Sequence, residues 1–391
     1  MSYDFNAELF VRDKEKIERK IDEFQGRRTQ REEWMEQNLS SLFREILETK
    51  SWYLITKEVS LFEKYYEGRN DNRKEDIKSG YKGFMKGINV HLLYDENLDD
   101  WVLFKKPKID TKSLPSHSNF ISVTFTLRKP YISQDDEEFY VIDNPICKDK
   151  VFKVPLVRPS SWKGNLRFAA LKGFEEDIFD EKINEANWKE ERAVLVRLFG
   201  NEKDKMSSYI DELISKCIYR NEKSSKDVEE EFEKYLVDKG YVGKEGTRQG
   251  RLVFYPTFLD KIDLDVITPL ERDTRTPARG PITFEVVPGR EVDERGEIKK
   301  GAKGSFSLLY FPFDLIDEEE ERVKKEVKED LEVLKDAIPA MLSKYGFGAK
   351  TTAGYGVVEI ENGALKTSFC WEKNFKDWNG FKEVINSIVE G

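Results

Sequence analysis

The feature that most constrains this fold is a glycine-rich segment between a long charged helical stretch and a short strand-like run. Residues 344–357 read Lys-Tyr-Gly-Phe-Gly-Ala-Lys-Thr-Thr-Ala-Gly-Tyr-Gly-Val. Glycine admits positive φ and lets a backbone approach another molecule closely. Successive backbone N–H groups in such a loop can form a nest for phosphate oxygens. The segment is either a tight helix-to-strand turn or a phosphate cradle built from Gly346, Gly348, Lys350, Gly354 and Gly356.

Two known phosphate-binding motifs do not match this segment. The P-loop order GxxxxGK[ST] is absent, and the segment follows a helix instead of opening one. A Rossmann fingerprint is excluded for the same reason.

The charge of the chain is unevenly distributed. The 391 residues have a net charge of -10, but residues 105–172 carry 13 Lys/Arg against 7 Asp/Glu. The acidic excess falls in helical stretches, at residues 174–191, 226–233 and 317–332. Local fields decide phosphate affinity, so the basic region remains a candidate for nucleic-acid binding. The alternative is that these charge runs are solvated faces.

The composition limits location and class. The length suffices for two domains or one elaborated domain. No apolar run approaches the roughly 20 residues needed to span a bilayer, and the N-terminus lacks the pattern of a signal peptide. The three cysteines are far apart without zinc-ligand spacing. We therefore expect a cytoplasmic, reducing location with no membrane partner.

Hydrophobic periodicity predicts a mixed α+β chain. Residues 1 to about 70 are helical in pattern, residues 81–104 are more β-like and aromatic, and residues 105–119 resemble a linker. Helices are predicted over residues 13–24, 30–48, 159 to about 171 and 318–344, with a kink at Pro339. Residues 193–199 form an apolar run that stops at Gly200. Strands are predicted over residues 120–127 (half-buried), 252–258, 305–311 and 357–360. Three further segments are expected to be a helical insertion (201–250), a loop or hairpin (268–304) and a partly helical tail (365–391).

Without its insertions, the region 119–362 has the order strand, helix, strand, strand, helix, strand. That order is typical of a ferredoxin-like α+β unit.

A helix start near residue 160 is a candidate anion site. Ser160 or Ser161 is a plausible N-cap, and a helix N-terminus with an exposed lysine attracts anions. Lys163 and Arg167 are four residues apart and share one helix face. Gly164 has no side chain, so the backbone of another molecule can lie close to the helix at this point.

Two other segments carry candidate residues. Asp143 precedes Asn144 and Pro145 beside the basic helix, where it would bind a divalent cation or orient a 2′-hydroxyl; the alternative is an Asx-turn. Arg272, Arg275 and Arg279 recur in a Pro/Gly-rich segment, and arginine pairs with phosphate and stacks on bases; the alternative is a flexible surface loop.

The chain has only two histidines, His91 and His117. No catalytic triad or histidine-rich metal site can be assembled from them. His117 is a candidate general base, with a solvated loop histidine as the alternative.

Three segments in this order resemble the RAMP superfamily of CRISPR-associated proteins, and most closely the backbone subunits of type III (Csm- and Cmr-type) effector complexes. They are Pro-Ser-Ser-Trp-Lys-Gly-Asn-Leu-Arg at 159–167, Arg-Leu-Phe-Gly at 197–200 with Gly-Arg-Leu-Val-Phe at 250–254, and the glycine-rich segment. Asp143-Asn144-Pro145 also matches a loop of these subunits.

The resemblance implies a ferredoxin-like (RRM-like) palm with a β-hairpin thumb and large helical insertions. The implied division is an N-terminal helical or mixed extension (1–110), a RAMP domain (111–362) and a C-terminal tail (363–391). Within the RAMP domain, the insertion would occupy about 201–249 and the thumb about 267–304.

The resemblance also implies a function in antiviral defence. The chain would bind crRNA through Ser160, Ser161, Lys163, Gly164, Arg167, the three thumb arginines and the glycine loop, together with other effector subunits. Asp143 would make it a metal-dependent endoribonuclease (Mg or Mn) acting on target RNA.

Two alternatives remain open. The chain would be a non-catalytic capping subunit of the same complex, or a guide-processing RAMP endoribonuclease. The latter class commonly relies on histidine, which is scarce here.

Overall fold

The computed structural model groups the chain into two compact units, each described by itself. The first comprises Met1–Lys105, Lys129–Leu156 and Phe258–Lys303, and the second comprises Lys106–Arg128, Val157–Thr257 and Gly304–Gly391. The structure describes residues 5–49, 59, 72–85, 88–89, 107–135, 142, 144–150, 153–201, 205–243, 247–268, 271, 274, 276, 280–292, 298–299, 301–369 and 371–389. Within these ranges, every helix is too short or too polar to cross a bilayer.

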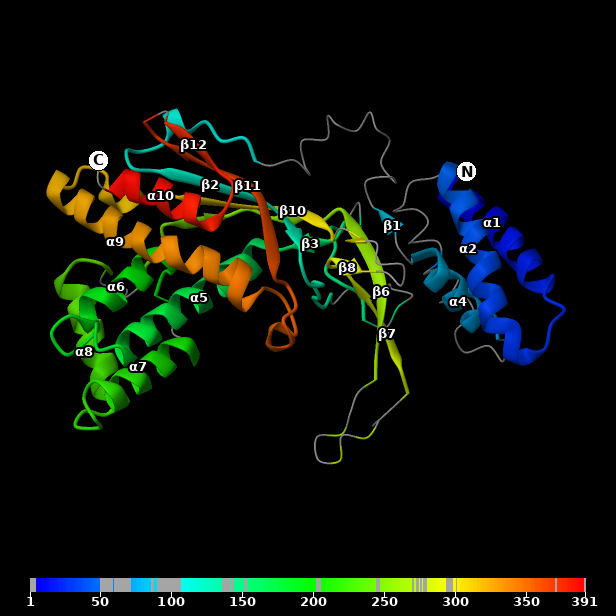
Figure 1. The fold of residues 1–391 in the computed structure, drawn as a ribbon, viewed down its shortest axis with the longest axis horizontal. Helices are drawn as coiled ribbons and strands as arrows, with labels where there is room; N and C mark the ends of the chain where they lie inside the picture. Colours follow the sequence, from blue (N-terminus) through cyan, green and yellow to red (C-terminus); the bar gives the residue numbers. More distant parts are fainter. Residues whose placement is uncertain are drawn as a thin grey trace. The chain divides into compact units, whose positions relative to one another are not determined.

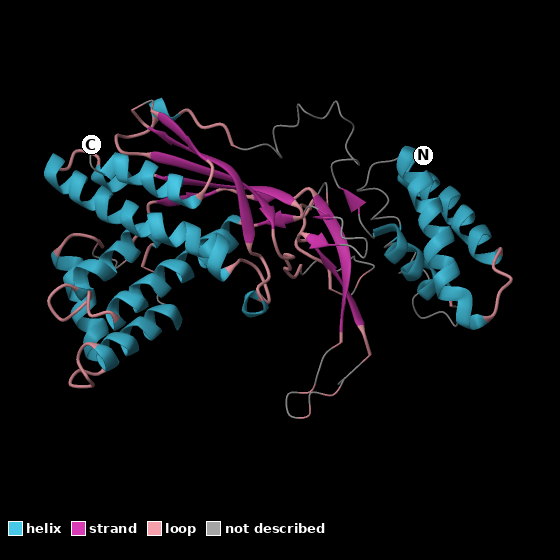
Figure 2. Cartoon of the chain, viewed as in Figure 1, coloured by secondary structure: helices cyan, strands magenta, loops and turns pink. Residues whose placement is uncertain are grey.

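The second unit is built on an antiparallel sheet with strand order β12-β11-β2-β10-β4 (Figures 1 and 2). Its strands are β2 (Asn119–Leu127), β4 (Leu252–Phe254), β10 (Lys303–Tyr310), β11 (Val358–Thr367) and β12 (Glu372–Phe375). The mixed α+β prediction is confirmed.

The central strand β2 is more buried than the predicted half-buried strand. Ile121, Val123, Phe125 and Leu127 point into the core and are fully buried. The opposite face is also covered at its start, where the Phe120 ring meets the Tyr255 ring at 6.0 Å. The alternation of apolar and polar residues therefore identified the strand. The burial of its second face could not be predicted, because it comes from Tyr255, which is distant in sequence.

Helices pack on this sheet and on one another. They are α5 (Pro159–Phe179), α6 (Trp188–Phe199), α9 (Glu320–Pro339) and α10 (Trp378–Val389), with short turns η5 (Thr111–Ser113), η6 (Phe313–Leu315) and η8 (Thr351–Ala353). Helix α5 lies against α9, and α10 lies against both α9 and β12. The predicted tail thus contributes an edge strand and a packed helix to this unit.

Two helix predictions needed correction or refinement. Helix α5 starts at Pro159 with Arg158 as its N-cap and without a side-chain cap bond, so the predicted cap at Ser160 or Ser161 is wrong. Proline's fixed φ suits the first helical position. Pro159 takes that position, so the N-cap is the residue before it, Arg158. After Pro339, helix α9 continues as π-helical turns (η7, Ala340–Tyr345), where the Ser343 hydroxyl donates to the Pro339 carbonyl at 2.6 Å.

The predicted insertion is helical and closes on itself. Helices α7 (Lys205–Cys217) and α8 (Ser225–Asp238) pack with α6 around Trp188, Ile214 and Phe232. Its two ends are neighbours, because a Cβ on Gly250 would meet the Leu198 carbonyl oxygen at 2.3 Å. The segment 201–249 therefore leaves and rejoins the rest of the second unit at one point.

The segments flanking this insertion hold a buried ionic network. Arg251 Nη1 binds Asp330 Oδ2 at 2.7 Å, and Arg197 Nε binds Asp330 Oδ1 at 3.0 Å. Arg251 Nη2 also binds Asp314 at 2.6 Å. Burial alone would raise the pKa of Asp314, but hydrogen bonds and charge from Arg251 and Arg248 lower it to about 2. Arg197 in α6 and Arg251, directly before β4, therefore stabilise the fold by joining these segments to α9.

The first unit begins with three helices, α1 (Phe5–Asp22), η1 (Arg28–Gln30) leading into α2 (Arg31–Thr49), and α4 (Arg73–Met85). Arg31 donates to Asp76 at 2.8 and 2.6 Å, and Gly80 lets α4 approach Leu39 of α2 closely. The predicted β-like character of residues 81–104 is wrong for Tyr81–Met85, which finish α4 because their rings fill the α2–α4 interface. Only Ile88–Asn89 (β1) is a described strand in that range.

A hairpin forms the rest of this unit. Strands β6 (Lys261–Ile267) and β7 (Ile282–Val286) pair antiparallel, β1 adds to β6, and β8 (Glu291–Val292) pairs with β9 (Ile298–Lys299). The chain crosses between units within β3 (Leu156–Val157) and β5 (Thr257–Phe258). Pro256 separates β4 from β5, so the strand predicted over residues 252–258 is two short strands.

Candidate nucleic-acid interface

The start of α5 presents small polar groups and one lysine to the surface. Ser160 and Gly164 are exposed, and Lys163 is half-buried. A Cβ added to Gly164 would meet nothing within 4 Å. The helix N-terminus attracts anions through its unpaired N–H groups and its dipole. The open space over Gly164 leaves room for a backbone to lie on this turn.

Trp162 anchors this turn to the core. Its ring is fully buried, and its Nε1 donates to Thr257 Oγ1 at 3.0 Å. Thr257 Oγ1 donates in turn to the Ser305 carbonyl at 2.8 Å. The indole fills the space under the helix start, so the polar residues on either side of it in sequence are directed outward.

Two glycines close the base of the glycine loop. Phe347 N donates to the Gly356 carbonyl at 3.2 Å. Gly346 and Gly356 have φ of 75° and 72°, and a Cβ on Gly356 would meet the Phe347 carbonyl oxygen at 2.0 Å. The loop's own packing therefore requires glycine at both positions.

The tip of the loop is the part open to solvent. Gly348 and Lys350 are exposed and have φ of 88° and 57°. Gly354 also has positive φ, and nothing lies within 4 Å of its Cβ position. Lys350 Nζ lies 6.0 Å from the centroid of the Tyr355 ring.

One aromatic contact brings these two segments together. The Trp162 and Phe347 ring centroids lie 4.5 Å apart, and both rings also contact Phe125 of β2. The exposed and half-buried residues of the helix start and of the loop tip form what we call the α5–loop surface: Ser160, Ser161, Lys163, Gly164, Gly348, Lys350 and Gly354.

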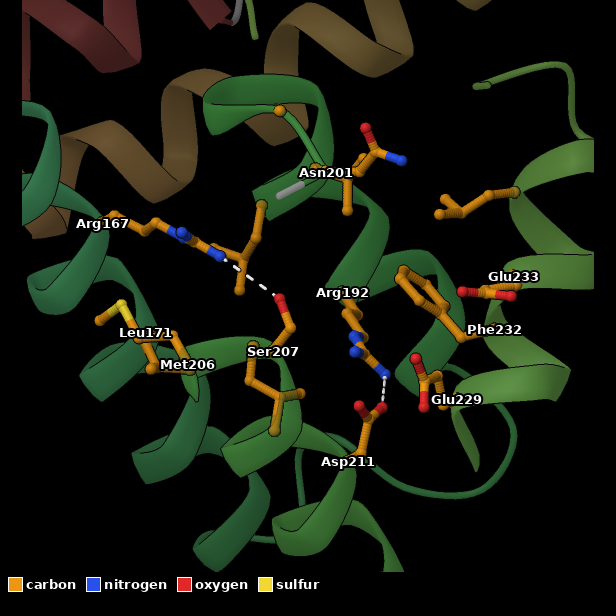
Figure 3. A pocket seen from close by; sticks show the side chains of 15 residues that line it. Arg167, Leu171, Arg192, Asn201, Met206, Ser207, Asp211, Glu229, Phe232 and Glu233 are labelled. Atoms are coloured by element: carbon orange, nitrogen blue, oxygen red, sulfur yellow. Dashed lines mark hydrogen bonds and ion pairs between the residues drawn. The ribbon is translucent and has the colours of Figure 1, made fainter. Parts of the chain in front are cut away.

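Arg167 is directed away from this surface. Figure 3 shows its guanidinium reaching the Ser207 hydroxyl of α7, at 3.4 Å. It lines a pocket of about 80 Å³ between α5 and the insertion. Opposite, the buried Arg192 pairs with Asp211 and lies over the Phe232 ring at 4.1 Å. Lys163 and Arg167 were predicted to share one helix face. Lys163 instead belongs to the α5–loop surface, while Arg167 contacts α7.

The remaining predicted residues lie outside the described residues. They are Asp143 and the three arginines Arg272, Arg275 and Arg279. The structure describes the segments next to them, namely the loop 144–150 and the two strands of the β6–β7 hairpin.

Glu285 of β7 clamps the loop that follows Asp143. Its Oε2 accepts from Ile146 N at 3.2 Å and pairs with the Lys148 ammonium, while its own N–H donates to the Asn144 carbonyl at 3.0 Å. Both side chains of the pair are fully buried. Burial lowers the pKa of Lys148, and the charge of Glu285 opposes that effect. Sequence reasoning missed this pair because nothing local marks Lys148 as buried.

These described residues do not make a metal site. The Asp135 carboxylate accepts from Lys148 N at 3.3 Å, and one Glu285 oxygen is taken by the lysine ammonium. The other oxygen, Oε1, is buried without a hydrogen-bond partner among the described residues. Across the described ranges, no three His, Cys, Asp or Glu residues gather as metal ligands. A cation-binding role for Asp143 therefore remains a proposal about that residue alone.

His117 is a loop residue with φ of 65°. Its ring contacts the Phe369 ring at 5.4 Å. Burial, followed by the nearby Lys324, lowers its pKa.

A family model and a curated relative match this chain. The model described as the RAMP superfamily matches residues 77–359. The "CRISPR system Cms endoribonuclease Csm3" of Streptococcus thermophilus is 24% identical over 228 residues, which cover 58% of this chain and 79% of that relative.

Solved structures give more distant likenesses. A chain of the Type III-B Cmr-beta complex bound to cognate target RNA has 14% identity and a TM-score of 0.42, covering 88% of this chain and 99% of that one. Cmr6 from Pyrococcus furiosus has 18% identity and a TM-score of 0.29, covering 62% and 98%. At such TM-scores, these structures carry no conclusion for this chain.

Proposed function

Because the chain belongs to the RAMP superfamily, we propose that it is a crRNA-binding backbone-type subunit of a type III CRISPR effector complex. Its relative Csm3 is named as an endoribonuclease of a CRISPR system. The partners are then crRNA, target RNA and other effector subunits.

The sheet order supports a ferredoxin-like palm for this subunit. The strands β2, β4, β10 and β11 occur in the sheet as β11-β2-β10-β4, with α5 between β2 and β4 and α9 between β10 and β11. That is the arrangement expected of a split βαβ unit. The β6–β7 hairpin, which brackets the three predicted arginines, is the proposed thumb.

The observation that carries the proposal is the joining of the α5 start and the glycine loop by Trp162 and Phe347. Two segments about 180 residues apart are held at van der Waals contact, with a helix N-terminus, an open glycine and two lysines around them. Helix N-termini and positive-φ loops bind phosphate oxygens. The α5–loop surface is therefore suited to an RNA backbone.

The proposed chemistry is cleavage of target RNA with Asp143 as the catalytic residue. In this proposal Asp143 orients the RNA 2′-hydroxyl, which loses its proton to solvent and attacks the adjacent phosphorus. The bond from phosphorus to the 5′-oxygen breaks, and that oxygen takes up a proton, which leaves a 2′,3′-cyclic phosphate and a 5′-hydroxyl. A bound divalent cation would offset the developing charge. The Glu285 clamp on residues 144, 146 and 148 would hold the Asp143 loop in place.

The test is to express the chain with the other subunits and a guide, and to compare it with Asp143→Ala. We expect short guide RNA to copurify with both, and the variant to lose cleavage at the positions cut by the wild type. Cleavage by Asp143→Ala at the full set of positions would refute the catalytic part. Absence of copurifying RNA from both would refute the RNA-binding part.

A second candidate is a non-catalytic capping subunit. Helices α1 and α2 precede the matched residues 77–359, and they provide extra surface for a partner. Stoichiometry separates the two, because a cap occurs once per complex and a backbone subunit several times. Native mass spectrometry of the assembled complex measures this directly.

A further inference from the structure

Helix α5 carries a second exposed feature beyond the α5–loop surface. Phe168 is 40% exposed, and its ring meets the Tyr345 ring edge-on at 5.5 Å between centroids. Tyr209 of α7, 39% exposed, also lies near Lys172. We call Phe168, Tyr345, Tyr209 and Lys172 the aromatic patch.

Lys172 lies close to two of the three rings of this patch, Phe168 and Tyr209. Its Nζ lies 5.9 Å from the Phe168 ring centroid and 6.0 Å from that of Tyr209. Lys344 Nζ lies 5.0 Å from the Tyr345 ring centroid. Exposed rings interleaved with cations are the usual surface for unpaired bases, since every base has a π-face that stacks on them.

Two carboxylates beside the aromatic patch decide which part of an RNA fits it. Glu175 accepts from the Tyr209 hydroxyl at 2.6 Å and pairs with Lys172, and Glu176 pairs with Lys344 at 2.9 Å. Two carboxylates beside the two lysines leave little net positive charge for a phosphate. A neutral base is therefore a better occupant than the sugar–phosphate backbone.

The patch also continues the proposed interface. Lys163 and Gly164 lie one to one and a half turns before Phe168 on the same helix, and Tyr345 directly precedes the glycine loop. An RNA strand whose phosphates lie on the α5–loop surface can turn a base toward Phe168.

We infer that the aromatic patch stacks on an unpaired base of the bound RNA. The inference rests on the proposed function, and it adds to it a contact from α7, within the insertion at residues 201–249. Base stacking on an aromatic ring is worth enough that its removal weakens RNA binding by about fivefold or more.

The test is photo-crosslinking with guide RNAs that carry 5-iodouridine at single positions, using the assembled complex. We expect crosslinks to Phe168, Tyr345 or Tyr209 from one or a few RNA positions. In a filter-binding assay with the full chain, Phe168→Ala should bind the RNA about fivefold more weakly and lose its crosslinks, while Phe168→Tyr should keep both.

Phe179→Ala is the matched control, because Phe179 is an exposed ring at the far end of the same helix. It should bind as the wild type does. If Lys163→Ala weakens RNA binding while Phe168→Ala changes neither affinity nor crosslinks, the inference is wrong and the proposed function stands. A Phe168→Ala variant that only loses a protein subunit would assign the patch to a protein and also overturn it. Failure of the wild-type chain to bind RNA would overturn both.

Discussion

The indole of Trp162 and the phenyl ring of Phe347 pack against each other with centroids 4.5 Å apart. One residue lies in the first turn of α5, and the other lies between two glycines of the loop before β11. Each is fully buried, and each is flanked by residues of the α5–loop surface. The contact therefore stabilises the domain and also sets the geometry of the proposed RNA site.

Removing one ring should destabilise the second unit. Phe347→Ala leaves a cavity beside Trp162, and such truncations cost about 3–5 kcal/mol. Urea denaturation, monitored by tryptophan fluorescence, measures the decrease in the free energy of unfolding. Phe369→Ala, at a ring that is 63% exposed, is the control and should change the free energy of unfolding by less than about 0.5 kcal/mol. Equal effects of the two substitutions would contradict the packing described.

Substitution of Lys163 should weaken RNA binding without regard to sequence. Lys163→Ala removes one phosphate contact, so the slope of log affinity against log salt should fall by about one. The measurement is fluorescence anisotropy with labelled guide RNA between low and high salt. Lys226→Ala, at an exposed lysine of α8, should leave both affinity and slope unchanged. An unchanged slope for Lys163→Ala would remove this residue from the interface.

Two glycines of α5 separate stability from binding. Neither Gly164 nor Gly173 has an atom within 4 Å of its Cβ position, so alanine fits at both. Each substitution should raise stability by about 0.5–1 kcal/mol, because alanine favours a helix.

Only Gly164→Ala should also lower RNA affinity, since its methyl group would occupy the space proposed for the backbone. Thermal melts and anisotropy measure the two quantities on each variant. Wild-type affinity in Gly164→Ala would place the RNA elsewhere.

Breaking the buried Lys148–Glu285 pair should be costly. Lys148→Met leaves an uncompensated carboxylate and should destabilise the protein by about 3–5 kcal/mol. The double variant Lys148→Met, Glu285→Leu should recover much of that loss, because no unpaired charge remains. Urea titrations of the single and double variants measure the coupling. A double variant no more stable than the single would mean that Glu285 acts mainly through its bond to Ile146.

Asp314 should contribute to the loss of stability in acid. Its folded-state pKa of about 2 lies below the ordinary value of 3.8. Its contribution is therefore complete above about pH 4 and is lost as pH falls through about 2. Asp314→Asn should flatten the fall in free energy of unfolding between those values, measured by urea titration at each pH. Asp336→Asn, at an exposed carboxylate on α9, is the control and should keep the wild-type profile.

The sequence predicted local structure best where periodicity and breakers agree. Helix α6 ends at Phe199, where the apolar run in the sequence also stops, and the following Gly200 takes φ of 87°. The order of strands and helices between β2 and β11 was also predictable. The end of α4 at Met85 was not, since its aromatic residues resemble a strand until α2 packs against them.

By itself, the sequence determined the order of elements, the family and the two segments of the α5–loop surface, because each depends on neighbouring residues and their spacing. Tertiary structure alone decided that Trp162 meets Phe347, that Arg167 turns to α7, that Arg251 is buried against Asp330, and that Lys148 is buried with Glu285. These outcomes depend on which distant segments share a contact and how deeply each is buried. Neither is encoded in the spacing of nearby residues, so the glycine loop could be recognised from sequence while its partner in space could not.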